Sequence, residues 1–223
     1  MYLKDYAKDL QSKSLATILL RSKEKIPIAG SSWKGRSAPL TNEEISLIES
    51  QKLNVGILTG EVNNIVVVDI DPRNGGSKSF EELEKLIGPI REKCKYIVKT
   101  GGNGFHLLFK LPDGINLNSQ KGFLPGLDFL SNGSYFVAPF STNKDGNQYF
   151  PLLSHNDKSL YVDDLSKLPS ELIRYLEAKK KSSHRTNSTN SQCALKNNHI
   201  IPEGQRNEQM FKKASALRRV LSS

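Results

Sequence analysis

Three observations predict an α/β fold for this chain. An apolar run begins at Ile65 and ends in Asp69-Ile70-Asp71, which is typical of a buried strand. Ser/Thr-x-x-Glu capping boxes at 41–44 and 79–82 indicate two helix starts. Two strand-like segments, 96–100 and 105–111, flank a glycine-rich turn. Helices and strands thus alternate along the chain.

The individual elements follow from periodicity, capping and turn residues. Tyr6, Leu10 and Ile18 lie near one side of a first amphipathic helix. Asn132-Gly133 is the favoured two-residue hairpin turn, so the strands on either side of it are expected to pair. The expected helices are 6–20, 41–51, 79–88 and 169–176. The expected strands are 54–60, 65–71, 96–100, 105–111, 128–131 and 134–138.

Composition limits the classes of protein that the chain can represent. No apolar run approaches the ~20 residues that span a bilayer, and the N-terminus lacks the pattern of a signal peptide. Cys94 and Cys193 are far apart and form no paired metal-ligand spacing. We therefore expect a cytoplasmic protein with no membrane partner and no structural zinc.

Charge divides the chain unevenly. Residues 1–176 carry 22 Lys and Arg against 20 Asp and Glu, whereas residues 177–223 carry 10 against 3. We expect a globular domain at 1–176, a basic polar linker at 177–198 and a helical segment at 199–223. The last segment ends without a capping glycine, so we expect it to begin a following domain. The basic tail suits contact with phosphate backbones, and a merely solvated tail is the alternative.

Acidic residues are placed at the end of one predicted strand and on another. Asp69 and Asp71 share one strand face, because alternate residues point the same way. Asp128 lies on a later strand. Paired carboxylates suit hard cations, which prefer oxygen ligands. The alternative for the pair alone is a surface turn continuing through Pro72.

A glycine-rich loop precedes a histidine. Residues 101–104, Gly-Gly-Asn-Gly, resemble loops whose backbone N–H groups bind anions, and His106 follows on the next strand. His106 points away from the face that carries Phe105 and Phe109. The alternative is a hairpin turn followed by a surface histidine. Carried together by antiparallel strands, three carboxylates and this histidine indicate a nucleotidyl transfer site.

A family resemblance covers about three quarters of the chain. Its motifs are residues 54–60, 67–71, 100–106, 126–129 and 135–141. In these residues the chain resembles the primase–polymerase domain of the archaeo-eukaryotic primase superfamily, as found in replication proteins of plasmids, phages and mobile elements. One departure is Gly104, where the family commonly has a serine, so backbone contacts are expected in place of a hydroxyl.

The resemblance implies both a fold and an activity. The fold is an RNA-recognition-motif-like antiparallel catalytic sheet beside a smaller N-terminal α/β lobe. The activity is primer synthesis or extension on a single-stranded DNA template from nucleoside triphosphates. A helicase, attached C-terminally or separate, is the expected protein partner.

The same resemblance assigns roles to residues. Asp69, Asp71 and Asp128 are the expected ligands of two Mg²⁺ or Mn²⁺ ions, and they act as the catalytic carboxylates. His106 is expected to bind the triphosphate rather than act as a base. The further candidates for nucleotide or phosphate contact are Asn103, Gly104, Lys25, Arg73, Lys99 and Lys144.

Two other functions remain open from the sequence. A non-catalytic replication module would keep the fold and bind DNA for an attached helicase, and the basic tail suits it equally well. A metal-dependent phosphodiesterase would use similar carboxylates. The full set of acids together with His106 favours the polymerase, because a binding module has no need of groups directed at a triphosphate.

Overall fold

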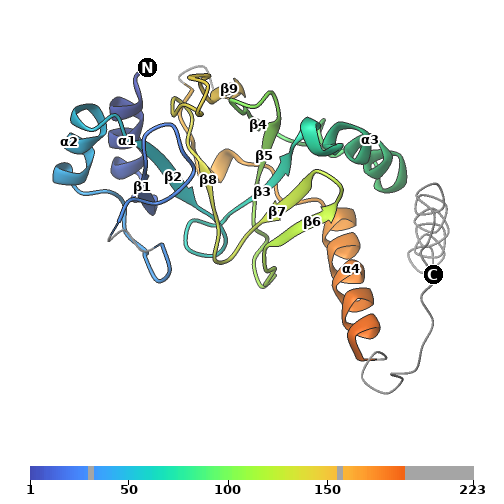
Figure 1. Ribbon diagram of the computed structural model, residues 1–223. Helices are drawn as coiled ribbons and strands as arrows, with labels where there is room; N and C mark the ends of the chain where they lie inside the picture. Colours follow the sequence, from blue (N-terminus) through green and yellow to red (C-terminus); the bar gives the residue numbers. More distant parts are fainter. Residues whose placement is uncertain (30–32, 155–157, 189–223) are drawn as a thin grey trace. The chain divides into compact units, whose positions relative to one another are not determined.

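The computed structural model describes residues 1–29, 33–154 and 158–188. The chain divides into two compact units, Met1–Pro169 and Ser170–Ser223. The first unit contains both β-sheets and every candidate site residue. Its helices and strands are arranged as Figure 1 shows.

A small antiparallel sheet is formed mainly by the N-terminal part of the chain. Its order is β1 (Thr17–Leu20), β2 (Asn54–Leu58) and β8 (Tyr135–Val137). Helices α1 (Leu3–Ser12) and α2 (Asn42–Ser50) pack against each other, and α1 also contacts β2. This part corresponds to the smaller α/β lobe that the family resemblance implies.

A six-stranded antiparallel sheet forms the rest of the first unit. Its order is β6 (Gln120–Leu124), β7 (Leu127–Leu130), β3 (Ile65–Ile70), β5 (Phe105–Lys110), β4 (Tyr96–Lys99) and β9 (Phe150–Leu153). The remaining elements of this unit are the short η1 (Pro72–Asn74), α3 (Gly76–Ile87) and η2 (Val162–Asp164). The mixed α/β class with antiparallel sheets agrees with the sequence prediction.

Strand β3 is buried on both faces. Ile65 and Val67 belong to the hydrophobic core that includes the small sheet. Val66 and Val68 alternate to the other face, where α3 packs against β3 and β7. Because Asp69 shares a face with Val67, it points toward the small sheet and not toward α3. The apolar alternation of β3 thus decides which face carries the candidate site.

The first predicted helix is too long. Helix α1 ends at Ser12, and Ser14 has a positive φ of 57°. Residues 17–20 then form strand β1, which is fully buried and pairs with β2. Short apolar runs fit a buried helix or a buried strand equally well, and here tertiary pairing selects the strand.

Two other local predictions are wrong. Residues 128–131 and 134–138 do not form a hairpin, since β7 belongs to the six-stranded sheet and β8 to the small sheet. The Asn132 side chain instead accepts a hydrogen bond from the backbone N–H of Glu61. Ser79 does not cap α3 but lies inside it, because Gly75 is the N-cap residue.

The second unit begins with α4 (Ser170–Ser188), directly after Pro169. The helix continues past the predicted end at Leu176, so the first part of the segment expected as a linker, 177–188, is helical. The rest of that segment and the helical segment expected at 199–223 lie outside the described residues. None of the described helices combines the length and the apolar character that crossing a bilayer requires.

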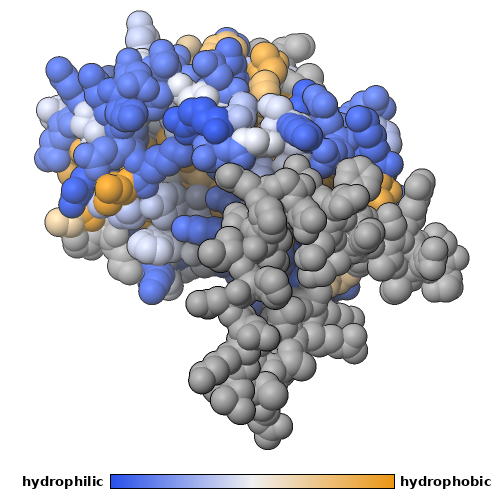
Figure 2. All heavy atoms as spheres, turned by 45° about the vertical axis from the view of Figure 1, so that its right-hand side comes forward, coloured by the Kyte–Doolittle hydropathy of each residue, from blue (hydrophilic) through white to orange (hydrophobic). Residues whose placement is uncertain are grey.

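The surface of the described residues is mainly polar. The face in Figure 2 is largely hydrophilic, with apolar side chains in small groups. The exposed large hydrophobic residues are Met1, Tyr2, Ile26, Val62, Phe150, Leu152 and Tyr161. Isolated exposed apolar residues are normal for folded proteins and indicate no binding site by themselves.

We expect Thr41→Ala to lower the free energy of unfolding by about 1 kcal/mol. Both halves of its capping box are formed, since the Thr41 side chain accepts from Glu44 N–H and the Glu44 carboxylate accepts from Thr41 N–H. Urea unfolding measures the change. Ser79→Ala is the control, because Ser79 lies within a helix and should change stability by less than about 0.5 kcal/mol. Equal losses in both variants would contradict the assignment of the cap.

Candidate active site

Three candidate site residues form a row across neighbouring strands. Asp69 on β3 pairs directly with His106 on β5 and with Asp128 on β7. Residues opposite each other in an antiparallel pair have Cβ atoms about 4.5–5.5 Å apart and point to the same face. The sheet register therefore brings together His106, Asp69 and Asp128, which lie far apart in sequence.

His106 is buried at one end of this row. Its side chain is 3% exposed, and its Nε2 lies 3.6 Å from Asp69 Oδ1. The ring packs edge-on against Phe136 and tilted against Tyr149, and no described residue hydrogen-bonds Nδ1. Burial lowers the pKa of His106, while the negative charge of Asp69 opposes this shift. The neutral imidazole is therefore favoured, and His106 is a buried residue rather than the surface histidine of the alternative interpretation.

The two carboxylates of the row differ in their contacts. Among the described residues, no donor hydrogen-bonds to the Asp69 carboxylate, which is 22% exposed. Asp128 Oδ1 accepts a hydrogen bond of 2.6 Å from the backbone N–H of Gly122 on β6. Partly buried carboxylates normally have donors or cations beside them. Asp69 therefore has lone pairs free for a ligand.

Asp71 lies two residues beyond Asp69, where the strand turns into η1. Its carboxylate accepts from Arg73 Nε and Nη2, at 3.1 and 3.2 Å, and from Asn74 Nδ2 at 2.9 Å. These hydrogen bonds, with that to Arg73 foremost, lower the pKa of Asp71. Asp71 is therefore ionised and is held by its own turn.

Two glycines fix the backbone of Asp71. Its N–H donates to Gly126 O at 2.8 Å, and its carbonyl accepts from Gly76 N–H at 2.9 Å. A Cβ at Gly76 would collide with the backbone of both Asp71 and Gly126. This close approach requires glycine, so the position of Asp71 depends on residues that have no side chain.

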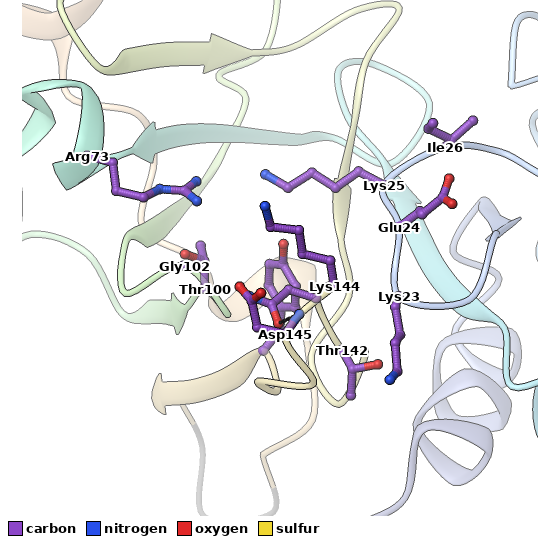
Figure 3. Close-up of a pocket in the computed structure, with 12 residues that line it drawn as sticks. Lys23, Glu24, Lys25, Ile26, Arg73, Thr100, Gly102, Thr142, Lys144 and Asp145 are labelled. Atoms are coloured by element: carbon purple, nitrogen blue, oxygen red, sulfur yellow. Dashed lines mark hydrogen bonds between the residues drawn. The ribbon is translucent and has the colours of Figure 1, made fainter.

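A pocket of about 340 Å³ lies beside the site. Lys25, Lys144 and Arg73 reach it from three different segments, and Figure 3 shows their charged ends directed into the same space. The full lining is Lys23, Glu24, Lys25, Ile26, Arg73, Thr100, Gly102, Thr142, Asn143, Lys144, Asp145 and Tyr149. Three of the four cations that we selected from the sequence thus gather in one place.

Tyr149 connects the pocket to the row formed by His106, Asp69 and Asp128, which we call the carboxylate row. It lines the pocket, its ring centroid lies 6.0 Å from that of His106, and it is 2% exposed. Burial raises the pKa of Tyr149 to about 12; the charge of Asp69 adds to the shift and that of Arg73 opposes it. Tyr149 thus lies within electrostatic reach of both the acidic row and the basic pocket.

The residues fit a divalent cation only in part. Asp69 and Asp128 offer carboxylate oxygens side by side, which is the donor chemistry that Mg²⁺ and Mn²⁺ prefer. Within the part of the chain that the structure describes, however, no three His, Cys, Asp or Glu side chains are arranged to hold one ion. The expected third ligand, Asp71, is turned toward Arg73. The three acids therefore share a region without forming one ligand set.

Other expected site residues lie elsewhere or are already bonded. Lys99 alternates with Val98, which faces the core beside His106, so Lys99 points to the opposite face of the sheet. The N–H groups of Asn103 and Gly104 donate to Thr100 O and Thr100 Oγ1 inside the turn. These two N–H groups are therefore not available to a phosphate in this structure, whereas the sequence predicted that Asn103 and Gly104 contact the nucleotide. Gly102 is the glycine of this turn that lines the pocket.

Sequence reasoning missed part of the pocket. Thr142, Asn143 and Asp145 reach it because an isolated bridge between Thr142 and Gln148 folds this loop back on itself. The Asn143 side chain then donates to Gly101 O at 2.7 Å, which joins the loop to the glycine-rich turn. The turn residues Asp145 and Gly146 were the available local signal, but nothing local indicated which strand pair the loop would meet.

We expect Gly104→Ser, which restores the residue common in the family, to destabilise this protein. A Cβ at position 104 would collide with the carbonyl oxygen of Ile70. The free energy of unfolding should fall by about 1–3 kcal/mol, the usual cost of overpacking. Gly102→Ala is the matched control, because its Cβ would meet the movable guanidinium of Arg73 at 3.2 Å. A Gly104→Ser variant as stable as the control would contradict this steric argument.

We expect His106 to make the metal-free protein less stable as the pH falls. Its folded-state pKa lies below the ordinary histidine pKa of 6.5, so the unfolded chain binds the proton more readily. Above pH 6.5 His106 does not change the free energy of unfolding, and from pH 6.5 down to its folded-state pKa it lowers this free energy progressively. Urea unfolding in EDTA, compared with His106→Gln, measures this contribution. Parallel pH profiles of the two proteins would show that His106 does not titrate as described.

Comparison with known proteins identifies the family of this chain. Residues 7–171 match the model of the Prim-Pol family, which is described as bifunctional DNA primase/polymerase, N-terminal. A comparison with curated proteins gave no match. The family match covers the small sheet, the carboxylate row and the basic pocket, and it spans more than half of the chain. The chain therefore belongs to the Prim-Pol family of bifunctional DNA primases/polymerases.

Proposed function

We propose that this protein catalyses template-directed, divalent-metal-dependent nucleotidyl transfer, as a DNA primase and DNA polymerase in replication. The observation that carries the proposal is the position of the carboxylate row beside the basic pocket. The row joins Asp69 to His106 and Asp128, and Tyr149 connects it to a pocket into which Lys25, Lys144 and Arg73 project. An acidic group next to a basic group suits a metal–triphosphate complex, which carries both charges.

The basic side of the pocket would bind the triphosphate. Lys25 and Lys144 supply point charges, whereas the planar guanidinium of Arg73 can bind two phosphate oxygens at once. These groups come from separate segments of the first compact unit, so together they can position the nucleotide. A pocket of about 340 Å³ lies within the usual size range of small-molecule sites.

The acidic side would hold the cations. Asp69 and Asp128 would be ligands, with Asp71 joining them once its carboxylate leaves Arg73. When bound, Mg²⁺ or Mn²⁺ would lower the pKa of the attacking hydroxyl and neutralise the charge that develops on pyrophosphate. The carboxylates orient the reacting groups by position and take no proton themselves.

His106 would act as a neutral hydrogen-bond donor. Burial disfavours its protonated form, and its Nε2 faces Asp69 across the strand pair. A neutral imidazole carries one N–H, and a donor at Nε2 suits a phosphate oxygen held at the same carboxylate row. The ring is held by Phe136 and Tyr149, so its direction is set before any ligand arrives.

Partners follow from this activity. The template would be single-stranded DNA, and the substrates would be nucleoside triphosphates. A helicase, on the same chain or separate, would supply the opened strand. A cytoplasmic location agrees with this role.

We expect Asp69→Asn and Asp128→Asn each to reduce primer extension about 10²- to 10³-fold, the cost of losing one preorganised electrostatic group. The assay extends a labelled primer on single-stranded DNA with Mg²⁺ or Mn²⁺. Lys99→Gln is the matched control, because Lys99 lies on the opposite sheet face and should leave extension nearly unchanged. Undiminished extension by both aspartate variants would exclude these carboxylates from the mechanism.

The same assay distinguishes the competing functions. A non-catalytic module would bind DNA with strong salt dependence and incorporate no nucleotide with either metal. A phosphodiesterase would shorten the labelled primer instead of extending it. Repeating the reaction with unprimed template, each nucleotide set and each metal, and sizing the products, separates chain initiation from extension.

A further inference from the structure

The position of the Asp71 carboxylate is unusual for a metal ligand. Four donors surround it: the Arg73 side chain through Nε and Nη2, the Arg73 backbone N–H and the Asn74 side chain. Asp69, two residues earlier and within β3, has no hydrogen-bond donor among the described residues. Asp71 is thus the carboxylate that must change partners before all three acids can act together.

The guanidinium that holds Asp71 also belongs to the pocket. Arg73 lines the cavity, and its side chain is 62% exposed. Figure 3 shows it extending from its own segment toward the space that Lys25 and Lys144 enter. A Cβ at Gly102 would lie 3.2 Å from Arg73 Cζ, so the glycine leaves the space that the guanidinium occupies. One side chain therefore touches both the expected metal ligand and the expected phosphate site.

We propose that Arg73 is a positioning residue that exchanges partners. It holds Asp71 away from Asp69 and Asp128 until a polyphosphate binds in the pocket and takes over the guanidinium, which frees Asp71 for a divalent cation. This inference rests on the proposed function of the site. It makes polyphosphate binding and cation binding cooperative through one side chain.

The exchange requires little structural change. The Asp71 backbone stays fixed by Gly126 and Gly76, and the Arg73 backbone N–H is part of the η1 turn. The exchange that we propose therefore uses the side-chain torsions of Asp71 and Arg73. An ion pair as exposed as this one is weak, because water screens it, whereas a polyphosphate offers the guanidinium several charged oxygens. The polyphosphate therefore competes successfully with Asp71.

The coupling is reciprocal. If Asp71 competes with polyphosphate for Arg73, then removing Asp71 strengthens polyphosphate binding in the absence of metal. If Arg73 competes with metal for Asp71, then removing Arg73 strengthens metal binding in the absence of polyphosphate. Each half can be measured with a single ligand, which avoids complexes between metal and polyphosphate in solution.

The first experiment measures Mn²⁺ binding by calorimetry without polyphosphate. Arg73→Gln should bind Mn²⁺ about two- to fivefold more tightly than the wild type, the range expected for releasing an exposed ion pair. Lys144→Gln removes the same charge from the same pocket but leaves Asp71 bound to Arg73, so its effect should be smaller. Equal tightening in both variants would reduce the effect to general electrostatics and overturn the proposal.

A double-mutant cycle makes the test specific to Asp71. Asp71→Asn should weaken Mn²⁺ binding less in the wild-type background, where Arg73 occupies the carboxylate, than in the Arg73→Gln background, where it should reverse the gain. Arg73→Lys keeps the charge without the planar fork and should give a smaller gain, which provides a second variant if Arg73→Gln misfolds. Additive effects of the two substitutions would overturn the exchange.

The second experiment measures binding of inorganic triphosphate in EDTA. Asp71→Asn should bind it about two- to fivefold more tightly than the wild type. Asp145→Asn is the control, because Asp145 lines the pocket without hydrogen-bonding Arg73. If Asp145→Asn gains as much affinity for triphosphate as Asp71→Asn does, competition for Arg73 is refuted.

These results separate the exchange from the proposed function. Mn²⁺ binding that is insensitive to both Asp69→Asn and Asp128→Asn would overturn the proposed function itself. Mn²⁺ binding that depends on Asp69, together with an additive double-mutant cycle, would overturn the exchange alone.

Discussion

The register of β3 between β5 and β7 is the constraint on which the site depends. It pairs Asp69 with His106 on one side and with Asp128 on the other. A slip of β3 by one residue would turn Asp69 to the opposite face of the sheet, away from His106 and Asp128. The register is held by the buried residues that precede the site, such as Val67 opposite Leu108 and Leu130. Apolar packing therefore determines where the polar groups meet.

The resulting site is incompletely paired by the protein itself. His106 Nδ1 is buried without a partner, and among the described residues no donor hydrogen-bonds to the Asp69 carboxylate. Such groups cost stability unless a ligand satisfies them, and they are common where a protein is organised to bind one. Three cationic side chains, Lys25, Lys144 and Arg73, enter the adjacent pocket from separate segments. The arrangement favours a ligand that carries both negative charge and metal ions.

The turn at residues 71–76 connects the carboxylate row to the basic pocket. It begins at Asp71, the N-cap residue of η1 directly after β3, and passes through Arg73, whose side chain reaches back to Asp71 and also lines the pocket. Gly76 and Gly126 allow the backbones to approach closely at this point. A short segment therefore joins the acidic row to the basic pocket, and small side-chain rotations within it can change the relation between them.

The sequence alone determined the elements whose signals are local, and the tertiary structure decided how they meet. The apolar run ending in Asp69 and Asp71, the cap at Thr41 and the glycine-rich turn before His106 were predicted because short-range alternation, capping and turn chemistry specify them. Strand β1 and the separation of β7 from β8 were not, because residues 17–20 and the Asn132-Gly133 turn have more than one locally acceptable conformation, and only pairing with distant strands selects one. For the same reason the sequence indicated which acids and cations to consider, whereas the hydrogen bonds of Asp71 and the place of Tyr149 in the pocket depend on contacts between residues far apart in the chain.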